Sequence, residues 1–384
     1  MNLFDVYPLY EVKPSSAKDV YVYDNQGGKY LDLYGGHAVI SIGHSHPHYV
    51  KQIKDQLDQI AFYSNAIQNP LQKRLADAIG EHSSLDNYEL FLCNSGAEAI
   101  ENALKLASFH TQKRRIVAFK NSFHGRTSAA VAATDNAKIT APLNEQQVVT
   151  FLPFNDLTAL EVELAKGDVC AVIFEAIQGV GGLDEPNEKF VYGMEKLCEK
   201  YHSSLVADEV QSGFGRSGTF FAFQKFKINP DIITMAKGMG NGFPIGGILV
   251  NPKIKATHGL LGTTFGGNHL ACRASLAVLD IIKKDNLQEK TKSLEKYFKN
   301  KASSIKKIKK IKGRGLMLGL EFDFEVSSLR KKLIYDYKIF TGGSSNKNLI
   351  RILPPLTIQE KHFDYFSSLL KRKWKKTIIK WNNF

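Results

Sequence analysis

Lys237 lies at the end of an apolar segment, residues 231–236, and directly before a glycine-rich turn, residues 238–247. A lysine at the end of a buried strand is unusual, because removing an ammonium group from water is costly unless the amine is neutral or paired. A desolvated lysine amine is also the nucleophile of enzymes that form Schiff bases with carbonyl compounds. Most lysines of a lysine-rich chain are simply solvated, so Lys237 becomes a candidate through the residues that accompany it.

Two carboxylates, Asp208 and Glu209, follow the apolar residues 204–207, and Asp208 precedes Lys237 by 29 positions. This interval leaves room for a turn, a helix or loop, and a further strand. Schiff-base chemistry in enzymes is most often that of pyridoxal phosphate, whose pyridine nitrogen needs a carboxylate partner so that the ring can take up electrons. Asp208 is the candidate for this partner, and a helix-cap or turn aspartate is the alternative.

A helix is expected to begin after the apolar residues 88–93 and to continue to Ala107. Ser95 and Glu98 match the capping-box pattern at its start, which requires no ligand. The free N–H groups of a helix start also suit a phosphate, and Gly96 would let the backbone approach it closely. The two interpretations are compatible, because a capped helix start is still an anion site.

Phe123, Arg126 and Glu175 follow two more apolar segments, residues 116–119 and 172–174. An aromatic ring can stack on a flat cofactor, and a guanidinium can hold a carboxylate with two parallel hydrogen bonds. Core packing is the alternative for Phe123 in a chain with 24 phenylalanines. Open α/β sheets bind ligands at the carboxyl ends of their strands, so the polar groups at these segment ends predict one shared site.

The length of the chain predicts two lobes, because 384 residues exceed the limit of about 250–300 for a single hydrophobic core. The N-terminal residues read as short strands and turns, with a hairpin signal at residues 20–28. Strands and helices then alternate, as in a mostly parallel sheet covered on both faces. A long helix is expected over residues 268–285, and the remainder should join the N-terminal segment in a small lobe.

Six motifs in their order and spacing resemble the class III, or ω-amino-acid, aminotransferases that use pyridoxal phosphate, and acetylornithine/succinylornithine aminotransferases most of all. The motifs are residues 94–99, 122–127, 175–179, 208–216, 237–238 and 262–268, with agreement also at residues 30–39, 43–47 and 350–356. The resemblance covers nearly the whole chain. It implies a fold-type I α/β architecture with a large, mostly parallel-sheet domain and a small α+β domain. The boundaries expected are 1–45 for the N-terminal part of the small domain, 46–270 for the large cofactor-binding domain, and 271–384 for a linking helix and the C-terminal small domain.

The resemblance also implies which residues bind the cofactor. Lys237 would hold pyridoxal phosphate as a Schiff base and later move a proton between substrate and cofactor. Asp208 would pair with the pyridine nitrogen, Gln211 would lie near the phenolic oxygen, and Phe123 would cover one face of the ring. The rest of the implied cofactor-binding set is Ser95, Gly96, Ala97, His124, Glu175, Val210 and Thr264, the last reaching across from the second subunit of a homodimer with shared active sites.

The substrates implied by the resemblance are an acylated ornithine and 2-oxoglutarate, which exchange an ω-amino group to give a semialdehyde and glutamate in arginine biosynthesis. Arg126 and Arg351 would hold substrate carboxylates, and Thr263 would lie close to the substrate. Ornithine, 4-aminobutyrate and acylated lysine are the alternative amine donors, and acetyl- and succinylornithine are equally compatible with the sequence. Residues 35–39 lie in the segment expected to line the far end of the substrate.

One position departs from the family pattern. Many relatives carry a glutamate where this chain has Val180, and that glutamate is understood to shield the guanidinium equivalent to Arg351 while an ω-amino substrate is bound. Valine cannot pair with a guanidinium, so Arg351 should remain open to carboxylates. We therefore expect a preference for ornithine whose α-amine is acylated, and poor use of free ornithine.

The composition, 43% hydrophobic and 23% charged, is typical of a soluble globular protein. The chain has neither an N-terminal signal segment nor a run of 18 or more apolar residues, so no membrane association is expected. The cysteines lack metal-ligand spacing and mostly lie in apolar patterns, which predicts no metal site and a cytoplasmic location with reduced thiols. They are Cys93, Cys170, Cys198 and Cys272.

The net charge of +13 raises the question of nucleic-acid binding. Much of the charge falls in residues 306–312 and 371–376. The first run has apolar residues every third position and suits the connection from a helix to an edge strand, and the second suits the basic end of the last helix. We therefore expect no nucleic-acid partner; positive potential would instead help to attract dicarboxylate substrates.

Two other classes of function compete with this interpretation. Residues 213–218 match the GxGxxG pattern of nucleotide-dependent oxidoreductases, but they do not directly follow a strand and residues 219–223 do not open a helix. The second rival is a catalytically silent pyridoxal fold used for binding, against which the intact set of Lys237, Asp208 and the two arginines argues.

Overall fold

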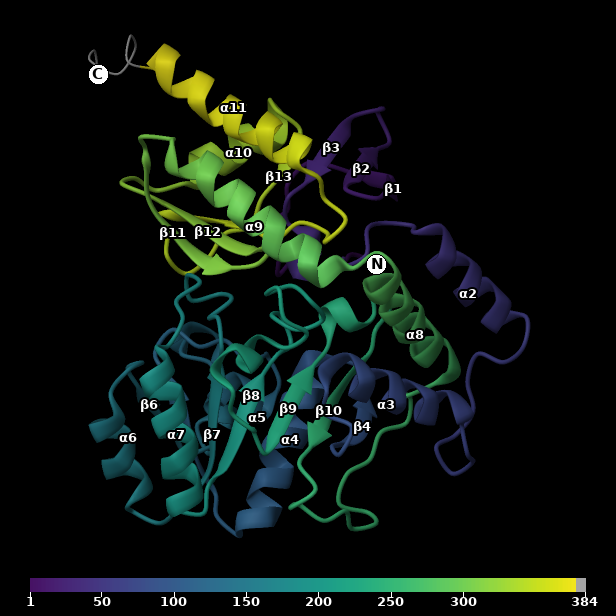
Figure 1. Cartoon of the computed structure of the whole chain (residues 1–384), viewed down its shortest axis with the longest axis vertical. Helices are drawn as coiled ribbons and strands as arrows, with labels where there is room; N and C mark the ends of the chain where they lie inside the picture. The colour runs from purple at the N-terminus through teal and green to yellow at the C-terminus, as the bar shows by residue number, and fades with distance from the viewer. Residues whose placement is uncertain (378–384) are drawn as a thin grey trace.

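A seven-stranded sheet forms the centre of the larger part of the molecule (Figure 1). In the computed structural model, which describes residues 1–377 and their side chains up to Lys371, the strand order is β4-β10-β9-β8-β7-β5-β6. The five strands from β9 to β6 run parallel, and β10 is antiparallel to both of its neighbours. The bounds are β4 Glu89–Cys93, β5 Arg115–Phe119, β6 Val149–Leu152, β7 Val169–Glu175, β8 Ser204–Asp208, β9 Ile232–Met235 and β10 Gly246–Val250.

Helices cover both faces of this sheet, and the continuous apolar runs in the central strands follow from that burial. Every residue of β7 and β8 is buried. Helix α4 (Gly96–Thr111) packs along β7, β8, β9 and β10 on one face of the sheet. On the opposite face, α6 (Leu157–Leu164) packs on α7 (Glu188–Lys200), which contacts β8, and α8 (His269–Lys284) packs on α3 (Pro70–Ser83). Helix α8 also packs on α2 (Pro47–Leu57). The helix expected over residues 268–285 is therefore confirmed as α8.

A second region, drawn above the large sheet in Figure 1, combines the start and the end of the chain. Its four-stranded sheet has the order β1-β2-β3-β13, in which β3 and β13 are parallel, and its three-stranded sheet has the order β11-β12-β14. The strand bounds are β1 Pro14–Lys18, β2 Tyr21–Asp24, β3 Lys29–Asp32, β11 Ile308–Arg314, β12 Met317–Phe322, β13 Ile339–Phe340 and β14 Leu349–Ile352. The helices here are α9 (Leu287–Ser303), α10 (Ser327–Tyr335) and α11 (Glu360–Thr377).

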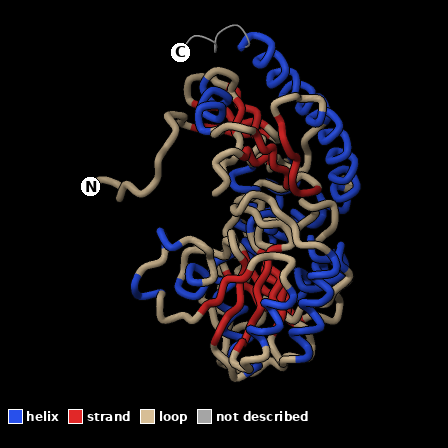
Figure 2. Tube along the Cα trace, turned by 90° about the vertical axis from the view of Figure 1, so that its left-hand side faces the viewer, coloured by secondary structure: helices blue, strands red, loops and turns tan. Residues whose placement is uncertain are grey.

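The two lysine-rich runs occupy the positions that their patterns predict. Strand β11 carries most of the first run and is an edge strand that directly follows α9. The second run falls in the final turns of α11, where the side chains from residue 372 onward lie outside the described part of the chain. The first residues of the chain extend away from the body of the molecule (Figure 2), and their side chains are exposed.

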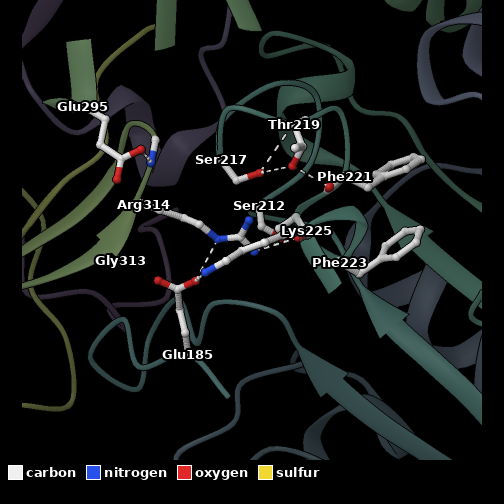
Figure 3. Close-up of polar contacts among 12 residues, drawn as sticks. Glu185, Ser212, Ser217, Thr219, Phe221, Phe223, Lys225, Glu295, Gly313 and Arg314 are labelled. Atoms are coloured by element: carbon white, nitrogen blue, oxygen red, sulfur yellow. Dashed lines mark hydrogen bonds and ion pairs between the residues drawn. The ribbon is translucent and has the colours of Figure 1, made fainter. Parts of the chain in front are cut away.

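Buried arginines join the two regions. Arg314, in β11, donates from Nε to Glu185 Oε2 at 2.7 Å and from Nη2 to the carbonyl of Ala222 at 2.7 Å. Figure 3 shows this pair with Lys225, whose Nζ lies 4.0 Å from the same glutamate oxygen. Arg216 donates from Nη1 to the carbonyls of Leu316 and Pro354 at 3.0 and 2.7 Å. These contacts fix the upper region over the carboxyl ends of the large sheet.

Candidate active site

Lys237 follows β9 at the carboxyl edge of the large sheet. It opens a short 3-10 helix, Lys237–Met239, with a left-handed φ of 47°. Burial lowers the pKa of its amine, and the charge of Arg351 lowers it further, while Asp208 and Glu175 act in the opposite direction. A lowered pKa increases the fraction of neutral amine, which is the nucleophilic form.

Asp208 ends β8 beside a buried histidine. Its Oδ2 lies 2.6 Å from Nδ1 of His124, and its Oδ1 accepts from the backbone N–H of Val210 at 3.0 Å. Burial by itself lowers the pKa of His124, but the hydrogen bond and charge of Asp208 and the charge of Glu175 outweigh burial, so the pKa is raised. Nε2 of His124 is buried without a partner among the described residues. Asp208 thus ends a strand and caps no helix, while its bond to the N–H of Val210 is the local contact expected of a turn aspartate, the other alternative.

Glu175 ends β7, directly beside Asp208 in the register of the sheet. Its two oxygens accept from the backbone N–H groups of Phe123 at 2.9 Å and Gly179 at 2.8 Å. Burial raises the pKa of this carboxyl to about 7, while the charge of His124 and the two N–H donors lower it. Glu175 therefore fixes the loop that carries Phe123 and the turn after β7.

The start of α4 forms another wall of the site. Ser95 is the N-cap residue, and its Oγ accepts from the N–H of Glu98 at 3.1 Å. Glu98 reaches back to the N–H of Asn94 at 2.7 Å, one residue before the N-cap, so the predicted capping box is present in a shifted form. A Cβ added at Gly96 would lie 2.6 Å from Cγ1 of Val210, which explains the glycine. The helix start is both capped and accessible from the site.

These elements enclose a cavity of about 350 Å³, lined by most of the residues that the sequence predicted for the site. The predicted residues that line it are Ser95, Gly96, Ala97, Phe123, His124, Arg126, Glu175, Asp208, Val210, Gln211 and Lys237. Three predicted residues do not line it. Thr263 lines a different hollow and accepts a hydrogen bond from Asn94 at 3.3 Å. Thr264 lines neither, and Arg351 lies behind the cavity wall.

Arg351 is 4% exposed, and its hydrogen-bond acceptors are all neutral. It donates from Nε to the carbonyl of Gly343 at 2.5 Å, from Nη1 to the carbonyl of Gly179 at 3.0 Å, and from Nη2 to the hydroxyl of Tyr34 at 3.2 Å. Gln211, which lines the cavity, has its Oε1 3.5 Å from Nη1. Among the described residues no carboxylate forms an ion pair with Arg351, so its charge is available to a ligand carboxylate.

Sequence reasoning missed Tyr34 and His37 as individual contributors. Tyr34 contacts Arg351, and Nδ1 of His37 lies 2.5 Å from the Tyr34 hydroxyl. The available signal was the sequence of residues 35–39, in which two glycines precede a histidine in the segment expected near the substrate.

The family model for class III aminotransferases matches residues 6–373 of the chain. The chain belongs to the class III aminotransferases. The acetylornithine aminotransferase of Bacillus subtilis is 38% identical over 378 residues, covering 97% of each chain. That of Aquifex aeolicus is 37% identical over 382 residues, covering 96% of this chain and 98% of the relative. The predicted family and its transaminase activity are confirmed, and the match over residues 6–373 argues against the nucleotide-dependent oxidoreductase.

Solved structures agree with this class III aminotransferase fold. The ornithine aminotransferase of Toxoplasma gondii superimposes with a TM-score of 0.89 at 25% identity, covering 98% of this chain and 93% of that one. Another structure of the Toxoplasma gondii enzyme, with a TM-score of 0.86 at 26% identity, has pyridoxal phosphate at partial occupancy in its active site. The predicted fold type and the predicted cofactor are confirmed.

The residues of the cavity fit pyridoxal phosphate. The unpartnered Nε2 of His124 and the open start of α4 offer polar groups to a ligand, and Gly96 allows a close backbone approach. Lys237, Asp208 and Phe123 supply an amine, a carboxylate and an aromatic ring around the same space. The described residues contain no cluster of side chains suited to a metal ion and no helix that could span a membrane.

Proposed function

We propose that this aminotransferase moves the ω-amino group of an N-acylated ornithine, acetyl- or succinylornithine, to 2-oxoglutarate. The relatives named as acetylornithine aminotransferases span nearly the whole chain and support this substrate class. The observation that carries the proposal is Arg351, a buried guanidinium with neutral acceptors only, behind a cavity that also contains Arg126. A guanidinium that lines the cavity and a second one behind its wall suit 2-oxoglutarate, which has a carboxylate at each end.

The residues of the cavity would bind the cofactor and move a proton during the reaction. Bound pyridoxal phosphate supplies an electron sink that makes a carbon–hydrogen bond next to the reacting nitrogen acidic. Lys237 would hold the cofactor covalently and, once released by the substrate amine, move the proton at Nζ. Asp208, backed by His124, would keep the pyridine nitrogen protonated, and Phe123 would cover one face of the ring. Ser95, Gly96 and Ala97 would bind the phosphate at the start of α4.

A donor with an acylated α-amine fits the neighbourhood of Arg351 better than free ornithine does. Val180 lines the cavity next to Gly179, whose carbonyl accepts from Arg351. Valine at position 180 offers no carboxylate to pair with the free α-ammonium group of ornithine, and none to shield the guanidinium from the α-carboxylate of the donor. The alternative donor is ornithine, and the structural similarity to ornithine aminotransferases favours it.

A panel of single half-reactions tests the proposal. Enzyme loaded with pyridoxal phosphate is mixed with acetylornithine, succinylornithine, ornithine, 4-aminobutyrate or acetyllysine, and the visible cofactor absorbance is followed. The two acylated ornithines should bleach the band fastest, and 2-oxoglutarate should restore it. Lys237→Ala should lack the covalent band, with Lys253→Ala as a surface control. Bleaching by ornithine as fast as by the acylated ornithines would overturn the proposed substrate class.

We further propose that the active form is a homodimer in which Thr264 completes the phosphate site of the other subunit. Neither Thr263 nor Thr264 lines the cavity of its own chain, although Thr263 is hydrogen-bonded to Asn94 of the cavity wall. Two aromatic side chains that contact each other at this segment, Phe265 and Phe62, are 59% and 41% exposed. Exposed apolar groups of this kind are typical of protein interfaces. Light scattering after size exclusion should give twice the chain mass of 42.9 kDa, and a fully active monomer would contradict the proposal.

The proposal also includes the expected location, pathway and partners of the protein. A cytoplasmic location is supported by four free, buried cysteines, Cys93, Cys170, Cys198 and Cys272. Arginine biosynthesis follows from the proposed substrates, and neither a nucleic-acid partner nor a membrane partner is proposed. The division of the chain at about residues 45 and 270 stays a prediction.

A further inference from the structure

The segment that precedes the cavity wall at Val39 has an unusual backbone. Gly35, Gly36, His37 and Ala38 have φ values of 55°, 53°, 67° and 64°, so four consecutive residues are left-handed. This conformation is costly for residues with a side chain, and such strain is typical of functional sites. A histidine and an alanine held in this way indicate that the position of the side chain at 37 matters.

Surrounding contacts fix the segment firmly. Asp32 Oδ1 accepts from the backbone N–H groups of Tyr34 at 2.9 Å and Gly35 at 2.8 Å. The other oxygen of Asp32 lies 2.9 Å from Nε2 of His44. Gln211, a cavity residue, donates from Nε2 to the carbonyl of His37 at 3.1 Å. The strained turn is therefore anchored to β3 on one side and to the active site on the other.

The hydrogen bonds between Arg351, Tyr34 and His37 bear on which ring nitrogen of His37 carries the proton. A guanidinium has only donors, so the Tyr34 oxygen accepts from Nη2 of Arg351 at 3.2 Å. The same oxygen lies 2.5 Å from Nδ1 of His37. The tautomer proposed below places the hydroxyl hydrogen on this side, so that Nδ1 accepts and Nε2 carries the ring proton. Desolvation by the surrounding protein lowers the pKa of His37, and Arg351 and Lys237 lower it further, so the imidazole is neutral near pH 7.

The Nε2–H group of His37 is free to bind a ligand. The side chain is exposed, and Nε2 has no hydrogen-bond partner within residues 1–371, whose side chains the structure describes. The carbonyl of His37 accepts from Gln211, a residue of the cavity wall, and the ring is joined to Arg351 through the hydroxyl of Tyr34, so His37 borders the site. A donor with a fixed tautomer, next to a guanidinium without a carboxylate partner, forms a composite site for an anion.

We propose that His37 is a specificity-determining residue, whose Nε2–H donates a second hydrogen bond to the substrate carboxylate that Arg351 binds. Tyr34 is the positioning residue: it fixes the tautomer of His37 and lies against the guanidinium, with its ring centre 5.6 Å from Cζ of Arg351. This inference deepens the proposed function, because it rests on a carboxylate substrate at Arg351. It names the chemical class recognised there as a dicarboxylic acid.

Substitution of His37 by asparagine tests the donor directly. Asparagine adopts left-handed φ values readily, and its amide can present an acceptor near the position of Nδ1, but it has no group at the position of Nε2. Binding of glutarate, a dicarboxylate that cannot react, is measured by calorimetry on the pyridoxal phosphate-loaded enzyme. Loss of one hydrogen bond to a charged group predicts a Kd about 10- to 100-fold higher for H37N. The KM for 2-oxoglutarate should rise in parallel, with a smaller change in kcat.

Three comparisons separate this role from a structural one. His258→Asn, the same change at an exposed histidine outside the cavity, should leave glutarate binding unchanged. His37→Gln, which can place an amide donor near the position of Nε2, should bind glutarate more tightly than H37N. Tyr34→Phe should weaken glutarate binding by releasing the His37 ring, without lowering the melting temperature by more than a few degrees.

Wild-type affinity in H37N, or equal losses in H37N and H37Q, would overturn the inference. Because glutarate binding requires no turnover, the result does not depend on which amine the enzyme uses. If the acylated ornithines fail to react but H37N still loses glutarate, the proposed donor is wrong and the role of His37 stands.

Discussion

Replacing Val180 by glutamate probes how the site controls Arg351. The carbonyl of Gly179, the preceding residue, is 3.0 Å from Nη1 of Arg351, and Val180 lines the cavity. A carboxylate introduced here would have an unpaired guanidinium within reach. It would then compete with any substrate carboxylate for the same charge.

The size of the effect follows from the burial of Arg351, which is 4% exposed. Two unit charges about 4 Å apart attract each other by about 4 kcal/mol at an effective dielectric constant near 20. Desolvation of the new carboxylate and the loss of side-chain freedom offset part of this attraction. A net competition of about 1.5–3 kcal/mol remains, which corresponds to a loss of affinity of about 10- to 150-fold.

Steady-state kinetics provide the assay. V180E should raise the KM for 2-oxoglutarate by that factor. It should also increase the preference for ornithine over acetylornithine, because the new carboxylate would attract the free α-ammonium group of ornithine, which acetylornithine lacks. Val180→Gln, which has nearly the same size and no charge, is the matched control and should change the KM much less. If V180E and V180Q behave alike, or if V180E binds 2-oxoglutarate more tightly, the reasoning that Arg351 binds substrate carboxylates is refuted.

Two other buried carboxylates give sharp expectations. Asp208→Asn removes the charge that raises the pKa of His124, and burial then lowers that pKa. We expect the free energy of unfolding, measured with denaturant, to fall by about 3 kcal/mol and the enzyme to lose most of its kcat. Glu209 accepts hydrogen bonds from the backbone N–H groups of Ala222 and Phe223 at 2.8 Å each. Glu209→Gln places an amide donor against one of these donors and should lower the free energy of unfolding by about 2–4 kcal/mol. The control Glu289→Gln, on the surface, should leave the free energy of unfolding almost unchanged. Burial raises the pKa of Glu209 from 4.5 to about 7, so the folded state binds this proton more tightly than the unfolded state does. The contribution of the proton to stability is therefore lost as the pH rises through 7. Calorimetry between pH 5 and 8 should show that the melting temperature of Glu209→Gln depends less on pH than that of the wild type.

The sequence predicted which side chains come together where a residue ends a strand of the large sheet, while their roles stay predictions. Asp208, Glu175 and Lys237 follow apolar runs, and parallel strands bring their carboxyl ends to one edge. The positions of these residues therefore follow from the strand pattern alone. The roles of Thr263 and Thr264 could not be judged in this way, because they lie in a loop without strand or helix periodicity.

The Tyr34–His37 pair was beyond sequence reasoning for a physical reason. Tyr34 contacts Arg351 across 317 positions of the chain, and His37 is joined to Arg351 only through Tyr34. The pairing of β3 with β13 and the bridge between Gly342 and Arg351 bring these segments together. No local pattern encodes such a contact. The left-handed turn gave a hint through Gly35 and Gly36, but His37 itself has an unfavourable φ that no propensity would predict. The fold imposes that conformation.

Glu175 connects the cofactor side of the site with the substrate side. One of its oxygens fixes the backbone of Phe123, and the other fixes the N–H of Gly179, whose carbonyl in turn holds Arg351. Glu175 is also paired in register with Asp208 at the ends of β7 and β8. Glu175 thus contacts or lies beside the elements that carry Phe123, Asp208 and Arg351. These are the proposed ring cover, the proposed partner of the pyridine nitrogen and the arginine that would bind substrate. A displacement of β7 would move all three together, so their relative geometry is preserved even where the surrounding loops adjust.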